Sequence, residues 1–232
     1  MSKKLPNITM IARALTNVTK LNILDSLMDG RGHTLLELSK SANVTPQTAS
    51  YHLKKFIELN WVRSEKSGRF HYFFLEDEQV AKLIEVFSPV SFEEPTVSMK
   101  QAIETDHIRH FRSCYDHMAG YVGREITSSL IAHNFLFENE HKLELTESGK
   151  MFFEHQLNID IGQLQKQKRQ FITSCLDWSE RKHHLGGALG HSLYLFFKDQ
   201  HFILPDKNVK RALSLTPNGN KFLKETLGIL VK

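Results

Sequence analysis

The stretch over 33–75 constrains the fold of this chain more than any other part of the sequence. Thr34 can cap a short helix over 35–42, and a tight turn follows it. Thr45 is a favourable N-cap for a second helix, and Pro46 would occupy the first helical position, where a helix tolerates proline best. The pattern therefore predicts two short helices joined by a tight turn.

The second of these helices has an apolar face and a polar face. Ala49, Leu53, Phe56 and Ile57 recur at helical spacing, so we expect them to be buried. The opposite face carries side chains that can exchange hydrogen bonds with base edges and phosphates. Its polar and basic residues are Gln47, Thr48, Ser50, Tyr51, His52, Lys54 and Lys55.

A two-stranded ribbon is predicted after the second helix. Segments 61–65 and 70–74 are rich in aromatic and β-branched residues, and they flank the basic tip Lys66-Ser67-Gly68-Arg69. Such a tip is a candidate phosphate-contacting wing. We expect base contacts in the major groove from Gln47, Thr48, Tyr51 and His52, although His52 could instead pack beside Tyr51. We expect phosphate contacts from Lys54, Lys55, Arg63, Lys66 and Arg69.

The order of helix, Asn-Val-Thr turn, "TASYHLKKFIELNWV" and "SGRFHYFFL" resembles the winged helix-turn-helix of ArsR-type bacterial repressors over roughly the first 88 residues. The resemblance implies that the helices predicted over 7–28 and 76–87 pack against a second protomer. Because winged-helix repressors bind paired half-sites, we expect a homodimer on double-stranded operator DNA. The alternative is that these helices only complete a monomeric core. The resemblance does not extend well to the metal sites of that family. A thiolate site needs a cysteine in the helix over 35–42, and a carboxylate-imidazole site needs a histidine in the helix over 76–87, and neither residue is there.

At 232 residues the chain is too long for one small winged-helix domain. We expect a DNA-binding and dimerisation domain over 1–88, a proline-containing linker over 89–98, and a C-terminal sensing or assembly domain over 99–232. The overall class is mainly α with short β wings (α+β).

The excess of basic residues lies in the N-terminal part of the chain. Between Arg31 and Tyr72 there are seven basic and three acidic residues, whereas residues 91–232 carry 18 basic and 17 acidic residues. We therefore expect the C-terminal part not to bind DNA. There is no signal peptide pattern and no apolar run long enough to span a membrane. Two cysteines without such a signal indicate a cytoplasmic protein with free thiols.

The C-terminal part contains an internal repeat, with copies over about 107–165 and 170–232. Cys114 matches Cys175, Asp116 matches Asp177, and each copy ends in a Leu-x-Leu-Thr segment whose threonine can cap a last helix. We expect two degenerate winged-helix-like units in pseudo-symmetry, with the cysteines at matched ends of two long helices and an effector pocket between the halves.

These cysteines lie near histidines in the sequence, and thiolate with imidazole is a ligand set that suits zinc. Three interpretations remain open: buried structural cysteines with helix-capping aspartates, a metal site, or a thiol or small-effector sensor. No cofactor is certain, and a metal ion or a small effector is the class that these residues would accommodate. The candidate effector residues are Cys114, Asp116, His117, Cys175, Asp177, Trp178, His183 and His184.

The sequence thus favours a sequence-specific DNA-binding transcriptional regulator, as a dimeric repressor released by an effector. An alternative is a constitutive architectural DNA-binding protein with a structural C-terminal domain. A thiol-dependent enzyme is a third reading, but no general base has a position fixed relative to either cysteine, so we expect no enzyme activity.

Overall fold

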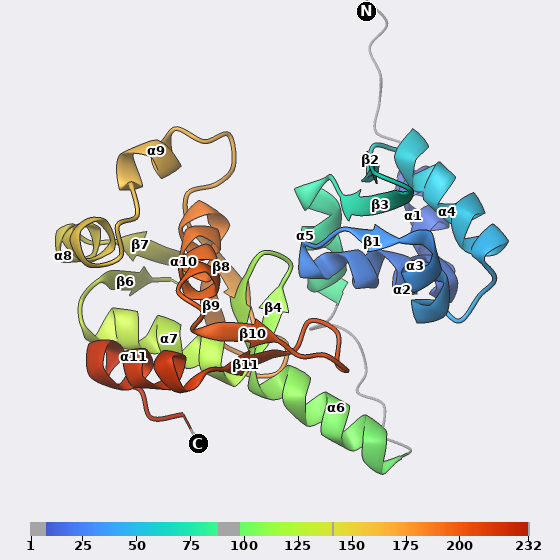
Figure 1. The fold of residues 1–232 in the computed structure, drawn as a ribbon. Coiled ribbons are helices and arrows are strands. Elements are labelled where there is room, and N and C mark those ends of the chain that lie inside the picture. The colour runs from blue at the N-terminus through green and yellow to red at the C-terminus, as the bar shows by residue number, and fades with distance from the viewer. Residues whose placement is uncertain (1–7, 88–97, 141, 232) are drawn as a thin grey trace, which may run out of the picture. The chain divides into compact units, whose positions relative to one another are not determined.

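The computed structural model describes residues 8–87, 98–140 and 142–231, and the chain divides into two compact units, Met1–Ile84 and Glu85–Lys232 (Figure 1). Of the linker expected over 89–98, residues 89–97 lie outside the described residues. None of the helices in the described ranges is both long and apolar enough to cross a bilayer.

The N-terminal unit is built from short helices and a three-stranded antiparallel sheet of order β1-β3-β2. Its elements are α1 (Ile8–Leu15), α2 (Val18–Ser26), the 3₁₀ turn η1 (Leu27–Asp29), β1 (His33–Thr34), α3 (Leu35–Ser41), α4 (Pro46–Glu58), β2 (Val62–Ser67), β3 (Phe70–Leu75) and α5 (Glu78–Phe87), the last of which crosses into the second unit.

The predicted helix starts of this unit are confirmed. The Thr34 side chain accepts a hydrogen bond from the Glu37 amide, and the Glu37 carboxylate accepts one from the Thr34 amide, which forms a capping box at α3. Thr45 caps α4 by accepting from the Thr48 amide at 3.2 Å, and Pro46 is the first helical residue. Because these signals are local, they determine where the helices begin regardless of the rest of the chain.

Packing in this unit follows the predicted apolar face of α4 with one exception. Ala49, Leu53 and Phe56 are buried, and the ring of Phe56 stacks on that of Trp61 with centroids 5.9 Å apart. Ile57 was expected to be buried, but it is 37% exposed. One residue beyond Phe56 the helix has turned by about 100°, so Ile57 points to the edge of the buried stripe rather than into it.

The C-terminal unit contains α6 (Met99–His110), followed by two copies of the same element order. The first copy comprises β4 (Arg112–Cys114), β5 (His117–Ala119), α7 (Gly120–Ala132), β6 (Leu136–Asn139), β7 (Lys142–Leu145), α8 (Glu147–Met151) and the π-helical turn η3 (Phe152–Gln156). After α9 (Ile161–Gln165), the second copy comprises β8 (Thr173–Leu176), β9 (His183–Gly186), α10 (Gly187–Asp199), β10 (Ile203–Pro205), β11 (Leu213–Leu215) and α11 (Pro217–Leu227).

Each copy is thus a hairpin, a long helix, a second hairpin and a last helix. The last helices are capped as expected, because Thr146 accepts from the Gly149 amide and Thr216 from the Gly219 amide. The mixed α+β class is also as predicted. The segment that precedes each long helix differs from the prediction, because Cys114 and Cys175 lie in the strands of the first hairpins and not at helix ends.

A glycine with positive φ makes the sharp transition from each first hairpin into its helix. Gly120 and Gly187 both have φ of +77°. A Cβ atom at Gly120 would lie 2.7 Å from the Arg109 carbonyl oxygen, and one at Gly187 would lie 2.8 Å from that of Gln170. Only glycine fits both the backbone angle and the space, so the helices begin here rather than at the preceding cysteines.

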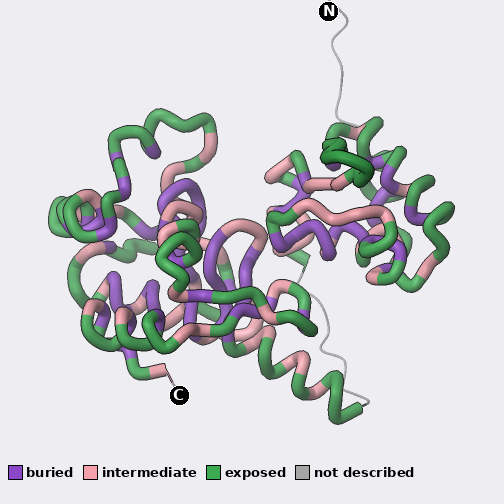
Figure 2. The backbone as a smooth tube through the Cα atoms, in the orientation of Figure 1, coloured by how far each residue is buried: buried purple, intermediate pink, exposed green. Residues whose placement is uncertain are grey.

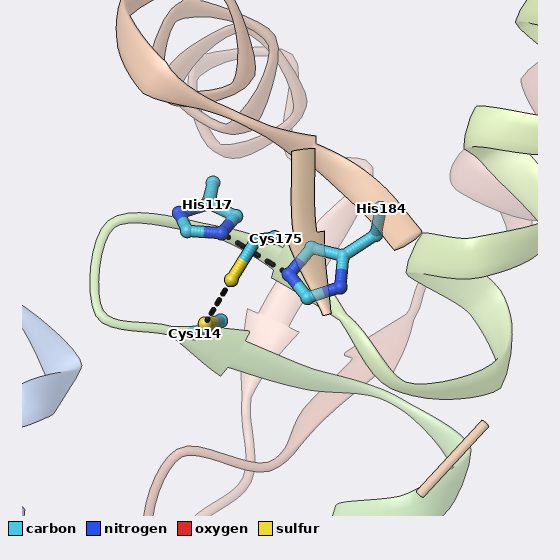
Figure 3. A group of neighbouring side chains, drawn as sticks. All are labelled: Cys114, His117, Cys175 and His184. Atoms are coloured by element: carbon cyan, nitrogen blue, oxygen red, sulfur yellow. Dashed lines mark hydrogen bonds between the residues drawn. The ribbon is translucent and has the colours of Figure 1, made fainter. Parts of the chain in front are cut away.

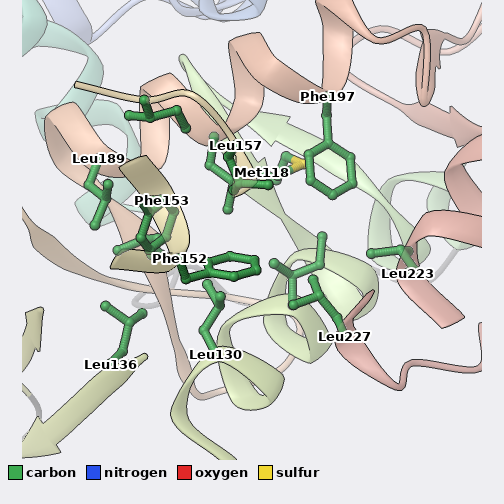
Figure 4. Close-up of a cluster of buried hydrophobic side chains, with 14 of the residues drawn as sticks. Met118, Leu130, Leu136, Phe152, Phe153, Leu157, Leu189, Phe197, Leu223 and Leu227 are labelled. Atoms are coloured by element: carbon green, nitrogen blue, oxygen red, sulfur yellow. The ribbon is translucent and has the colours of Figure 1, made fainter. Parts of the chain in front are cut away.

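The two copies share one hydrophobic core (Figure 4). It joins Val122, Ile126 and Leu130 of α7 to Leu189 and other apolar side chains of α10. The first hairpins are buried too: every residue of β4 and β5 and most of β9 are buried, as Figure 2 shows by colour. β5 packs against α10 while β9 packs against α7, so each hairpin lies on the helix of the other copy.

Candidate functional site

The polar face of α4 is open to solvent. Gln47, Thr48, Ser50 and Tyr51 are exposed, with Tyr51 61% exposed although it is a large aromatic residue. Burial of the opposite face orients these side chains outward from the N-terminal half of the helix. An α-helix that presents donors and acceptors in this way has the shape and chemistry to enter a major groove.

His52 differs from its neighbours on this helix. Its side chain is half-buried, its Nδ1 atom is inaccessible, and its ring lies edge-on to Tyr51 with centroids 5.5 Å apart. Burial and the nearby Lys20 ammonium lower the pKa of His52. A neutral, half-buried imidazole at the edge of the polar face fits packing beside Tyr51 at least as well as a base contact, and both roles stay open.

The hairpin β2–β3 forms the wing. Ser67 pairs with Phe70 across the turn, and Gly68 occupies the left-handed region with φ of +59°. Lys66 and Arg69 flank this tip and are exposed. The tip therefore presents two cations at the end of a hairpin that β1 supports on its other side.

Two of the other expected phosphate contacts are engaged by acidic side chains. Arg63 forms ion pairs with Glu65 at 2.7 Å and Glu76 at 2.9 Å, and its guanidinium lies 4.0 Å from the Phe74 ring centroid. Lys55 pairs with Glu58 at 2.9 Å. These carboxylates offset the charge that Arg63 and Lys55 would offer to a phosphate, whereas Lys54 lies exposed on α4.

In the C-terminal unit, four of the expected effector residues converge (Figure 3). We call them the Cys2His2 cluster: Cys114, His117, Cys175 and His184. Their possible ligand atoms all lie within 4.8 Å of one another. The two sulfur atoms are 3.7 Å apart, and the two Nε2 atoms are 3.1 Å apart.

The strand register explains this convergence. Cys114 is the direct cross-strand partner of His117 in β4–β5, and Cys175 is that of His184 in β8–β9. The Cβ atoms of such partners lie about 4.5–5.5 Å apart on one face of a hairpin. Each hairpin therefore presents one thiol and one imidazole side by side, and the two hairpins face each other.

Asp116 and Asp177 contact the cluster histidines from outside. Asp116 lies 3.4 Å from Nδ1 of His117, and Asp177 lies 3.5 Å from Nδ1 of His184. Burial alone would raise the pKa of both carboxyls. Hydrogen bonds from His117 and Arg169 instead hold the pKa of Asp116 well below its usual range, and the charges of Arg112 and His184 do the same for Asp177.

Solvent has little access to the cluster. Cys114 and His184 are each 1% exposed and His117 is 8% exposed, while Cys175 is half-buried. A hydrogen bond with Cys175 and burial raise the pKa of the Cys114 thiol well above its usual range. Burial would lower the pKa of His117, but Cys114 and Asp116 raise it to about 10.

Besides the two aspartates, the expected effector residues Trp178 and His183 also lie outside the cluster. Trp178 packs under the guanidinium of Arg112, which is 4.5 Å from its ring centroid. His183 precedes His184 in β9, so its side chain points to the other face of the strand, where Glu138 lies 3.9 Å away. Neither offers an atom to the group of four.

Three residues that the sequence patterns do not mark hold the aspartates. Arg112, although 1% exposed, pairs with Asp177 at 3.0 Å, and Arg169 donates to Asp116 at 2.7 Å. His191 contacts Asp116 through Nδ1, 3.3 Å from the carboxylate. No local signal identifies them, because each reaches its aspartate only through the packing of the two copies.

Comparison with known proteins gives a family match at the N-terminus and a relative over almost the whole chain. Residues 16–63 match the family model described as winged helix-turn-helix DNA-binding. YdfF of Bacillus subtilis (strain 168), described as an uncharacterized HTH-type transcriptional regulator, is 37% identical over 226 residues, which cover 97% of this chain and 99% of that protein.

Two solved structures each match part of the chain. NolR from Sinorhizobium fredii is 22% identical with a TM-score of 0.34, and the match covers 39% of this chain and 96% of NolR. A second match is the homodimeric winged helix-turn-helix domain of Mb0332 from Mycobacterium bovis, which is described as a possible ArsR-family transcriptional regulator. It is 22% identical with a TM-score of 0.32, and the match covers 44% of this chain and 82% of that domain.

Proposed function

Because this chain belongs to the HTH-type transcriptional regulators and carries an N-terminal winged helix-turn-helix, we propose that it is a dimeric, sequence-specific repressor of transcription. The observation that carries the proposal is the open polar face of α4, capped at Thr45 and followed by a wing with a basic tip. Such a helix reads base edges while the wing contacts the phosphate backbone. A repressor of this kind acts in the cytoplasm, where its operator lies.

The proposed base-contacting residues are Gln47, Thr48, Ser50 and Tyr51, with His52 at their edge. The proposed phosphate contacts are Lys54, Lys55, Lys66 and Arg69, and Arg63 supports the wing through its ion pairs. Two copies of this surface would bind two half-sites about one helical turn apart, which is why we propose a homodimer.

Footprinting on the DNA upstream of the protein's own coding region, followed by titration of the protected fragment, tests this proposal. We expect a palindromic protected site and binding that competitor DNA of unrelated sequence does not abolish. Equal affinity for the upstream fragment and for unrelated DNA would contradict sequence-specific repression and would favour the architectural alternative.

We further propose that an effector releases the repressor by acting on the C-terminal unit. The support is its charge balance and its paired, buried repeats, which suit assembly or ligand binding better than DNA contact. Operator affinity that changes when metal ions, oxidants or small metabolites are added would separate a regulator from a constitutive DNA-binding protein.

We propose that the chain binds rather than catalyses. Thiol catalysis requires an accessible thiolate with a positioned base, whereas Cys114 is 1% exposed and Cys175 is half-buried. An assay for thiol-dependent hydrolysis of activated esters tests this directly, and turnover lost in Cys114→Ser would contradict the proposal.

A further inference from the structure

The Cys2His2 cluster has the dimensions of a tetrahedral metal site. A zinc ion with bonds of about 2.3 Å to sulfur would hold two thiolates about 3.8 Å apart, and bonds of about 2.0–2.1 Å to nitrogen would hold two imidazole nitrogens about 3.3–3.4 Å apart. The corresponding distances are 3.7 Å between the sulfurs and 3.1 Å between the Nε2 atoms. Two of the six edges of the tetrahedron, the S···S and the N···N edge, are therefore nearly formed by the protein alone.

The aspartates orient the imidazoles for this role. Nδ1 of His117 faces Asp116 and Nδ1 of His184 faces Asp177, which favours the proton on Nδ1 in both rings. The two Nε2 atoms face each other at 3.1 Å, where a proton on one of them makes a hydrogen bond between the rings in the metal-free cluster. A metal ion would replace that proton and accept both Nε2 lone pairs, and carboxylate–histidine–metal arrangements use the same tautomer with the proton on Nδ1.

The charges around the cluster balance when a divalent ion is included. Asp116 is offset by Arg169, and Asp177 by Arg112. Two thiolates and one divalent cation are then neutral together. A buried site without net charge avoids the large cost of leaving an isolated ion in a region of low dielectric constant.

We propose that the Cys2His2 cluster binds one Zn²⁺ ion, which joins the two repeats of the C-terminal unit. Mixed thiolate and imidazole ligands in a tetrahedron are typical of zinc, and four protein ligands leave no open position for a substrate. The site is therefore structural and does not depend on DNA binding or on the proposed repressor activity. Each hairpin supplies two ligands, so the ion links β4–β5 to β8–β9.

The full-length wild-type protein gives the first test, and this test needs no variant. We expect one zinc per chain after purification with zinc, and an X-ray absorption spectrum with two sulfur neighbours at about 2.3 Å and two nitrogen neighbours at about 2.0–2.1 Å. Replacement by Co²⁺ should give visible absorption of a tetrahedral ion and thiolate-to-metal charge transfer. Substoichiometric metal, or a shell of oxygen and nitrogen only, would overturn the proposal.

Variants test the joining of the repeats. Cys175→Ser and His184→Ala should each lower zinc affinity at least tenfold. The matched control is His155→Ala on the exposed side of η3, which should bind zinc as the wild type does. A chelator should lower the Tm of the wild type and the control but leave that of Cys175→Ser unchanged. An equal effect of the chelator on all of these proteins, or no effect on any of them, would refute the role of the ion.

Discussion

The wing offers the sharpest test of DNA binding, because its three lysine and arginine residues differ in how their charge is engaged. Lys66 and Arg69 flank the exposed tip, whereas Arg63 lies near the base of β2 between Glu65 and Glu76. We predict that the double variant Lys66→Ala/Arg69→Ala loses much of the salt dependence of DNA binding. Arg63→Ala should change that dependence far less.

The magnitude follows from counterion release. Each phosphate that a cation neutralises contributes about −0.9 to the slope of log K against log salt for B-DNA. Two contacts per wing and two wings per dimer would therefore reduce the slope by about 3.6. Between 50 and 200 mM salt this difference amounts to about a hundredfold in relative affinity.

Arg63→Ala is the control, since it removes one positive charge from the same hairpin, half of what the double variant removes. Its guanidinium is already paired with two carboxylates and packed over the Phe74 ring, so its removal should cost wing stability more than phosphate contact. Fluorescence anisotropy with an operator duplex at several salt concentrations measures both variants. An unaltered slope in the double variant, or an equal change in Arg63→Ala, would show that the tip does not contact phosphate.

Three further predictions concern single positions. Gln47→Ala should weaken binding to the operator by about 1–3 kcal/mol while leaving binding to unrelated DNA unchanged, as titration against both duplexes would show. Asp116→Asn should lower zinc affinity about 10–100-fold, because the carboxylate that orients the His117 ring is lost. Competition with a chromophoric chelator measures this affinity, and an unchanged value would mean that Asp116 plays no part in the site. Gly120→Ala should destabilise the C-terminal unit by about 1–3 kcal/mol because its φ is +77° and the new Cβ would lie 2.7 Å from a carbonyl oxygen. Denaturant unfolding measures the loss in free energy of unfolding, and Gly68→Ala is the control, since Gly68 has a φ of +59° but open space around it. Equal losses in the two variants would show that the contact between the new Cβ and the Arg109 carbonyl oxygen is unimportant.

Local signals in the sequence predicted the N-terminal unit well. Thr34, Thr45 and Pro46 act on the helix that each begins, and Gly68 acts on its own turn, so their neighbours along the chain are sufficient to interpret them. The engagement of Arg63 by Glu76 could not be predicted in the same way. It depends on the register of β2 against β3, which brings Arg63 opposite Phe74 and thereby near the end of the next strand.

The first hairpins of the C-terminal unit were missed because their strands are too short to show a period of two. β4 and β5 have three residues each, and all six are buried, so neither strand has an exposed face whose polar residues would mark a period of two. In the sequence, so short a segment before a helical pattern is equally compatible with the first turn of that helix. The positive φ at Gly120 decides against that, and a glycine alone does not reveal φ in a sequence.

The repeat itself pairs the four proposed metal ligands between the two copies. His117 precedes Gly120 by three residues, and His184 precedes Gly187 by three, so the histidines match as closely as the cysteines do once the second copy is allowed a longer hairpin loop. One copy supplies only a thiol and an imidazole, which is half of a tetrahedral ligand set. Two copies related by a pseudo-two-fold axis bring the halves together wherever their first hairpins meet, and here β5 also packs against β9. Neither copy can complete the proposed zinc site alone. The same packing that buries the shared core of the two copies also brings their four ligands together, so the site follows from the pairing of two similar units.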